Sequence, residues 1–311
     1  MNLVGIFVVV LGSLALLAPG AKAADPLRIC LDQDAPPFSL KRGDRVGGFD
    51  LALAQTIAEK MGRSLSVQWF EAEDQPEKGK DTRTSVAALL ADKRCDLGAA
   101  FPLFADSLAG PQTEHARLPR YQGRTNEDRR RAVALSELIG SQPYIYTAPA
   151  VVLGPKIAGK VINNLADLDG VRIGVEQSSF PDVILTLYQN GRLLPNVAHI
   201  VPGRGLLERF EAGQYDAALV DIHRFDGYRS DHPETALRLS RYLHPFGFNL
   251  GFVSRAREVE LMSAVNRVIN KLLDDGEVEV QAKRAGLTYL APREPAVRLS
   301  PTIVDLIKDS D

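Results

Sequence analysis

The residues best suited to chemistry in this sequence are a pair of serines, Ser178 and Ser179, which follow a buried apolar run at residues 171–176. The segment from Phe180 onward reads as a helix, so the serines stand at its start. The free amides and positive dipole end of such a helix attract a carboxylate or another anion, and the two hydroxyls add donors. Serine is also a favoured helix cap, so a purely structural role stays open.

No catalytic constellation accompanies these serines. The sequence lacks a Gly-x-Ser-x-Gly elbow, a phosphate loop and a His-Glu-x-x-His motif, and its five histidines fall in unrelated segments. The neighbours Asp221 and His223 are more typical of a helix cap and a surface side chain than of an acid-base pair. Two cysteines with no histidine nearby are a poor metal site. We therefore expect no enzymatic activity, no cofactor and no metal.

The first element that must position a site is a helix between Gly48 and Gly62. Asp50 can accept hydrogen bonds from the free amides of its first turn, and Leu53 and Ile57 begin an apolar stripe. Gly62 supplies a left-handed stop.

A strand and a proline-rich loop precede this helix. Residues 27–31 read as a strand, and consecutive prolines exclude helix and ladder pairing from the loop at 32–39. Ligands of open α/β sheets bind at the carboxyl ends of strands, which makes Asp34 and Phe38 in this loop candidate ligand contacts.

The alternation of strand and helix continues downstream. A strand at 65–69, a helix that ends near 93–94 and a strand at 95–101 predict an α/β fold with a parallel, doubly wound sheet. Residues 24–311 exceed one comfortable core, so we expect two lobes of ~100 to 150 residues each.

The N-terminal 23 residues read as a secretory signal peptide. The apolar run at 3–17 is shorter than the ~20 residues of a spanning helix, and Ala21-Lys22-Ala23 fits a signal peptidase site. We expect cleavage after Ala23 and a soluble, periplasmic monomer with no further membrane span. The net charge of -2 argues against nucleic acid or an anionic membrane as a partner.

Several short motifs, in the right order, resemble those of family 3 periplasmic solute-binding proteins. Pro37-Phe38 and Gly48-Phe49-Asp50-Leu51 resemble the opening signature, 165–176 resembles the DLxGxxxGV passage, and 246–253 resembles the return crossover. The resemblance extends to about residue 290. It implies a two-lobed type II binding-protein fold, with doubly wound sheets joined by two crossover segments.

The resemblance also implies a function and a division of the chain. A small polar, amino-acid-like solute would bind between the lobes and pass to the permease of an ABC transporter. The expected division is a signal peptide at 1–23, lobe 1 at 24–148 and 249–290, lobe 2 at 149–248, and a tail at 291–311 packed on the first lobe.

Three further site residues come from the resemblance. In the family an aspartate at a strand end holds the ligand's ammonium, and Asp221 maps onto it, with a helix cap as the competing explanation. An arginine ahead of a Ser-x-Pro-Tyr passage clamps the carboxylate, and Arg129 precedes Ser136 at a similar spacing. Ala100 lies where the family has Gly-Met-Thr.

A subgroup of this family accompanies periplasmic quinoprotein alcohol dehydrogenases in methanol oxidation, and the opening resembles it too. The shared features are a cysteine in the first strand, Trp69 and Arg94-Cys95-Asp96. They imply an alternative, an accessory factor that docks on a dehydrogenase. A dehydratase-type enzyme on the same fold is a third reading, which requires a cleft carboxylate or histidine with a strongly shifted pKa.

Two features leave alternatives open. Cys30 and Cys95 either form a disulfide, as an oxidising compartment permits, or are two separately buried side chains. Residues 102–134 interrupt the strand and helix pattern, and the part at 115–131 carries six arginines and two acidic residues. A solvated loop, a docking surface for an acidic partner and a lid over the cleft all fit this composition.

Overall fold

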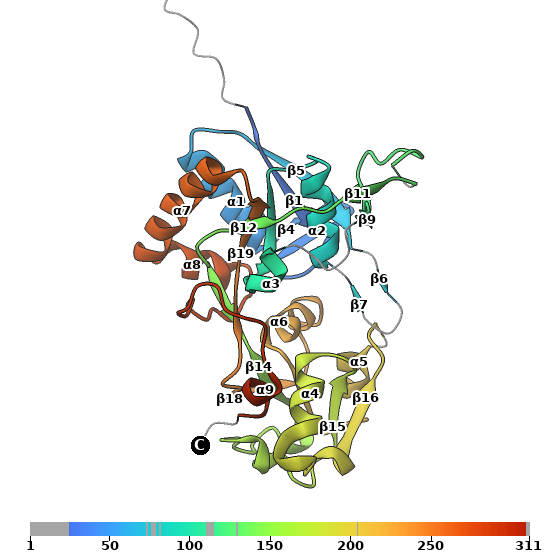
Figure 1. The fold of residues 1–311 in the computed structure, drawn as a ribbon. Helices are drawn as coiled ribbons and strands as arrows, with labels where there is room; N and C mark the ends of the chain where they lie inside the picture. Colours follow the sequence, from blue (N-terminus) through green and yellow to red (C-terminus); the bar gives the residue numbers. More distant parts are fainter. Residues whose placement is uncertain are drawn as a thin grey trace, which may run out of the picture.

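The computed structural model describes residues 25–72, 74–75, 79–80, 82–109, 115–128, 130–203 and 205–308. Two separate sheets with flanking helices form two lobes, drawn one above the other in Figure 1. Lobe 1 is built on a seven-stranded sheet and lobe 2 on a five-stranded sheet. The predicted signal peptide lies outside the described residues.

The sheet of lobe 1 has the strand order β10-β5-β1-β8-β19-β12, with β13 also paired to β19. β5, β1 and β8 are parallel, whereas β19 runs antiparallel to β8, so the sheet is mixed and not wholly parallel. The strands are β1 Leu27–Asp32, β5 Leu65–Glu71, β8 Leu97–Pro102, β10 Arg120–Tyr121, β12 Leu138–Gly140, β13 Ile145–Thr147 and β19 Phe248–Arg255. The helices of this lobe are α1 Phe49–Lys60, α2 Thr82–Ala91, α3 Ala105–Leu108, α7 Val259–Asp274 and α8 Glu277–Arg284.

The predicted first helix is confirmed as α1, but its start differs from the prediction. Gly48 is the N-cap, and no side chain caps the helix. The carboxylate of Asp50 lies in the core, only 1% exposed, and accepts a hydrogen bond of 2.9 Å from the Tyr144 hydroxyl. The expectation that Asp50 accepts first-turn amides is therefore wrong, because the side chain lies on the buried face of the helix.

Lobe 2 has the strand order β16-β15-β17-β14-β18. β15 is parallel to both β16 and β17, and β14 is antiparallel to its two neighbours. The elements are β14 Pro149–Leu153, β15 Ile173–Glu176, β16 Val197–Ile200, β17 Ala217–Asp221, β18 Arg238–Leu243, α4 Phe180–Leu187, α5 Leu206–Glu211 and α6 Ile222–Asp231. Short 3-10 turns occur at η1 Pro155–Ile157, η2 Leu165–Leu168, η3 Tyr188–Asn190 and η4 Leu194–Asn196.

Among the described residues, three small sheets accompany the two main sheets. β2 Asp34–Ala35, β3 Ser39–Arg42 and β4 Arg45–Gly47 follow the first strand, while β6 Asp74–Gln75 pairs with β7 Gly79–Lys80. β9 His115–Arg117 pairs with β11 Ala132–Ala134, and β10 extends the edge of the lobe 1 sheet. The described part of the insertion at 102–134 thus contains secondary structure and is not only a loop.

The chain passes between the lobes next to paired strands. β13 pairs in the lobe 1 sheet and is followed by β14 in the lobe 2 sheet, and β18 in lobe 2 is followed by β19 in lobe 1. The division at 148 and 248 stays a prediction. Within the described part of the chain, no helix is long and apolar enough to cross a bilayer.

The C-terminal tail contacts lobe 1, as expected, and it also contacts lobe 2, which the sequence did not predict. Arg298 forms an isolated β-bridge with Phe104 of lobe 1. The amide of Arg298 donates to the carbonyl of Leu103 at 3.1 Å. The tail ends in α9 Ile303–Ile307, which Figure 1 shows beside α4 of lobe 2. Leu306 of α9 is only 5% exposed, because it packs in the apolar core of lobe 2.

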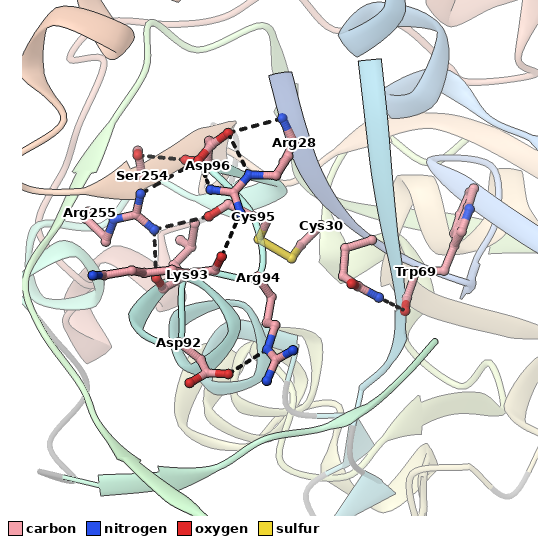
Figure 2. Close-up of a disulfide and its surroundings, with 12 residues drawn as sticks. Arg28, Cys30, Trp69, Asp92, Lys93, Arg94, Cys95, Asp96, Ser254 and Arg255 are labelled. Carbon is pink, nitrogen blue, oxygen red and sulfur yellow. Dashed lines mark hydrogen bonds and ion pairs between the residues drawn. A yellow bond between two sulfur atoms is a disulfide. The ribbon is translucent and has the colours of Figure 1, made fainter. Parts of the chain in front are cut away.

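Cys30 and Cys95 form a disulfide, shown in Figure 2. Cys95 was expected to begin a strand, but β8 begins only at Leu97, so Cys95 still lies in the turn after α2. That turn brings the two Cα atoms to 5.6 Å, within the range a disulfide can bridge.

Candidate functional site

A cavity of about 580 Å³ lies where strand-end loops of the two lobes meet. Lobe 1 contributes residues 34–36, and lobe 2 contributes the turn from β15 to α4, the start of α5 and one face of α6. Three predicted site residues, Asp34, Ser178 and Ser179, line this cavity together. Its lining contains four carboxylates and one guanidinium, together with one histidine: Asp34, Glu176, Glu208, Asp231, Arg224 and His232.

The serine pair performs the capping role and also faces the cavity. Ser179 is the N-cap of α4, because its Oγ accepts from the amide of Asp182 at 3.2 Å and donates to the carbonyl of Glu176 at 2.6 Å. Ser178 has a φ of 63°, the left-handed region that favours glycine. Its amide donates to the Asp182 carboxylate at 2.8 Å, while its hydroxyl is exposed and makes no hydrogen bond to any described residue. Ser178 thus supplies the free hydroxyl of the pair.

Ion pairs organise the charged lining and connect the lobes. Arg42 of β3 pairs with Asp34 in its own lobe and with Asp231 of α6, at 3.0 Å. Arg224 of α6 pairs with Glu176 at the end of β15. Because these side chains are partly exposed, each pair is worth at most about 1 kcal/mol. Their main effect is to place Arg224 among the acidic residues of the cavity lining and Arg42 beside Asp34 and Asp231.

Asp221 is used entirely within the chain. It is the N-cap of α6, where one carboxylate oxygen accepts from the amide of His223 at 3.0 Å. The other oxygen accepts from the Thr147 hydroxyl at 2.6 Å. Asp221 does not line the cavity, nor do Phe38 and Ala100. The structure therefore does not bring these three predicted residues to the same cavity as the serines.

Helix α6 of lobe 2 lies at the boundary between the lobes in Figure 1 and packs directly on lobe 1. The side chain of His223 is 2% exposed, and its ring packs edge-on against that of Phe38, with 5.1 Å between the ring centroids. Its Nε2 forms a 3.1 Å hydrogen bond with the Thr288 carbonyl. Asp226, also buried, accepts from the amide and hydroxyl of Thr288 at 2.7 and 2.8 Å. Burial raises the pKa of Asp226 above its usual value, against the lowering effect of the Thr288 hydrogen bonds.

Sequence reasoning missed this contact, although Gly227 gave a signal. A glycine inside a helix costs about 1 kcal/mol relative to alanine, which often marks a close approach of another segment. Here a Cβ on Gly227 would lie 2.4 Å from the carbonyl oxygen of Pro36. The tight contact between α6 and the proline loop needs a residue without a side chain.

Gly227→Ala is expected to separate the lobes. The added methyl group cannot fit against Pro36, so the contact should weaken by about 1 to 3 kcal/mol, although alanine itself favours the helix. Small-angle scattering should show a larger radius of gyration. Gly159→Ala is the matched control, because a Cβ there meets nothing within 4 Å. Scattering curves that coincide for both variants would contradict the expectation.

Ala100 belongs to a buried hydrogen-bonded chain beside α1. Its amide donates to the Tyr144 hydroxyl at 2.8 Å, and that hydroxyl donates to Asp50 at 2.9 Å. Burial raises the pKa of Asp50 to about 7, against a lowering effect of the Tyr144 hydrogen bond. Burial also raises the pKa of Tyr144 well above its ordinary value. Arg129, the predicted carboxylate clamp, lies outside the described residues.

Comparison with known proteins places the fold. No family model matches the chain. Over 262 residues the chain is 23% identical to the arginine-binding extracellular protein ArtP of Bacillus subtilis (strain 168), covering 81% of this chain and 82% of that protein.

Solved structures agree with this similarity. A substrate binding domain from Streptococcus pneumoniae Canada MDR_19A matches with a TM-score of 0.61 and 16% identity, over 83% of this chain and 99% of that chain. The L-cystine solute receptor of Neisseria gonorrhoeae, in its unliganded open conformation, matches with a TM-score of 0.58 and 17% identity, over 86% and 96%. An ancestral cationic amino acid solute binding protein matches with a TM-score of 0.56 and 18% identity, over 83% and 94%. The predicted two-lobed α/β binding-protein fold is thereby confirmed.

Proposed function

We propose that the protein is a periplasmic solute-binding protein, which captures a small polar, amino-acid-like solute between its lobes and delivers it to an ABC transporter. The observation that carries this proposal is the cavity of about 580 Å³ at the strand-end loops of both lobes. The binding roles in the names of the similar proteins support it. The mature chain would act as a monomer, with lobe boundaries at residues 148 and 248.

The residues divide into two groups in this proposal. Asp34, Ser178 and Ser179 contact the solute in the arrangement described here. Phe38 and Asp221 reach it only when α6 moves away from lobe 1, because His223 covers the ring of Phe38 and the Asp221 carboxylate is held by Thr147. Ala100 would gain a free amide only if Tyr144 moved, and Arg129 stays a predicted partner for a carboxylate.

A thermal and urea unfolding screen against amino acids, small acids and amines tests the proposal. A true solute at ~100 times its dissociation constant should raise the free energy of unfolding by ~2.7 kcal/mol. Ser178→Ala should weaken the affinity by about tenfold, since it removes one hydrogen bond of roughly 1.4 kcal/mol. Ser64→Ala, an exposed serine of lobe 1 away from the cavity lining, should leave the affinity unchanged. Stability that no compound changes would refute the solute-binding role.

A second candidate, the accessory factor of a quinoprotein dehydrogenase, is favoured by the filled contact between the lobes. Asp221 spends its carboxylate within the chain, and His223 occupies the face of Phe38. This candidate requires that no solute stabilise the protein and that it co-elute with an added periplasmic dehydrogenase. A dehydratase activity has little support, because Asp50 and Asp226, the described carboxylates with raised pKa, do not line the cavity.

A further inference from the structure

A second hollow, of about 500 Å³, lies on lobe 1 and shares no residue with the cavity between the lobes. We call it the basic groove, lined by Lys93, Ala134, Ser136, Glu137, Arg255 and Arg257, with Ala91 and Ala256 between them. Three of its side chains are cationic and one is acidic. The groove therefore carries a positive charge on a protein whose net charge is -2.

The paired strands β9 and β11 extend this surface, and we call them the arginine ribbon after Arg117, the one arginine in the two strands. Ala116 and Val133 are buried in the cluster of α2, while the alternate residues on both strands face outward. Ala134 pairs with His115 and lines the groove, and Arg117 pairs with Ala132 on the same outward face. The groove and the outer face of the ribbon thus form one continuous surface.

Some cations of this surface have a carboxylate partner and others have none. Within the described residues no carboxylate pairs with Lys93, Arg117 or Arg130, all of which are exposed. Arg257 is 65% exposed and pairs with Glu258, whereas Arg255 pairs with both Glu258 and Asp96, so the uncompensated charge lies on Lys93 and Arg117. Exposed charges without counter-ions produce a positive potential that attracts an acidic surface.

Hydrogen bonds and a disulfide connect the backbone under the groove, as drawn in Figure 2. The Arg255 guanidinium, 10% exposed, donates to the carbonyls of Leu90 and Cys95 at 2.9 and 3.1 Å. Lys93 has a φ of 58°, and its carbonyl accepts from Arg28 at 2.9 Å. These contacts and the disulfide at Cys95 fix the backbone that presents the cations. A surface fixed before binding loses less entropy when a partner docks.

The described residues that connect β9 to β11 are likewise attached to lobe 1. Asp128, 5% exposed, pairs with Arg94 at 3.1 Å and accepts from the amide and hydroxyl of Thr125 at 3.0 and 2.8 Å. These bonds lower the pKa of Asp128 to about 2, with the Thr125 amide as the main cause. Arg131 pairs with Asp92 beside Lys93, and the Arg94 guanidinium lies 5.1 Å from the Tyr121 ring. These contacts hold the described part of this connection against the rest of lobe 1.

From this surface we infer that the basic groove and the arginine ribbon form a docking site for an acidic segment of a partner protein. A membrane fits less well, because none of the exposed large apolar side chains lies in the described part of 115–134 or in the groove lining. Surfaces that enter a bilayer combine cations with such side chains. The small alanines between the cations leave room for the side chains of a peptide.

The test uses a fluorescein-labelled peptide of alternating glutamate and alanine and measures its anisotropy with the full mature chain. At about 0.01 M salt, where the Debye length is about 30 Å, the peptide should bind, and the affinity should fall as salt rises. Replacing Lys93, Arg117 and Arg257 together by glutamate should weaken binding at least tenfold. Thermal unfolding checks that the variant stays folded, as expected for exposed positions.

The matched control replaces Lys160, Arg241 and Arg284 by glutamate, which changes the net charge equally at exposed positions away from the groove. This variant should retain the affinity of the wild type within about twofold. The proposal is overturned if both variants lose affinity equally, or if the wild type does not bind the peptide at low salt. It is also overturned if vesicles with anionic headgroups bind the wild type and the peptide does not.

Discussion

Replacing Cys30 and Cys95 together by alanine is expected to lower the free energy of unfolding by about 4 kcal/mol. The disulfide closes a loop with a sequence separation of 65, and the chain-entropy relation for such a loop gives roughly this value. The loop contains α1, β5 and α2, so without the bond the unfolded chain gains freedom over residues 30–95. Urea unfolding under oxidising conditions measures the difference.

Reduction of the wild type separates the cross-link from the packing of the two side chains. Both cysteines are buried, 1% and 0% exposed, so the alanine variant also loses two sulfur atoms from the core. Reduced wild type keeps those atoms. Its free energy of unfolding should be lowered nearly as much as that of the double variant. Equal urea midpoints for the oxidised and reduced protein would show that the cross-link contributes nothing.

The fold could be predicted from the sequence because its signals are local. The apolar runs at 27–31 and 171–176 contain the buried strands β1 Leu27–Asp32 and β15 Ile173–Glu176 in whole or in part, and α1 runs from Phe49 to Lys60 between the predicted glycines. The position of the Asp50 side chain could not be predicted. Its burial depends on Tyr144, a residue 94 positions away, and capping preference is only a local tendency.

The candidate site was predicted in part by the same kind of reasoning. Asp34, Ser178 and Ser179 follow strands whose carboxyl ends face the other lobe, and the strand-end rule brings them together. Phe38 and Asp221 also lie near strand ends, yet His223 of α6 covers Phe38, and Asp221 caps α6 and does not line the cavity. How closely two lobes approach is set by contacts such as Gly227 with Pro36, which are distant in sequence. A glycine inside a helix can indicate that another segment lies close, but a local pattern does not identify that segment.

The ionisation of Asp50 should make the stability of this protein depend on pH near neutrality. Its ordinary pKa is about 3.9, and burial raises it to about 7 in the folded state. A raised pKa means that the folded state holds its proton more tightly than the unfolded state does. The stabilising effect is therefore complete below about pH 4, and it is lost as the pH rises through about 7.

Asp50→Asn should remove this dependence, since an amide cannot ionise and its oxygen can still accept from Tyr144. A shift of about three units corresponds to about 4 kcal/mol. Relative to wild type, the variant should therefore gain up to about 4 kcal/mol between about pH 4 and pH 8, as urea unfolding at several pH values will measure. Asp305→Asn is the control, because Thr302 lowers the pKa of Asp305 and places its effect below that range. If the Asp50→Asn and wild-type curves stay parallel across the range, the buried carboxyl does not titrate there, and the raised pKa is wrong.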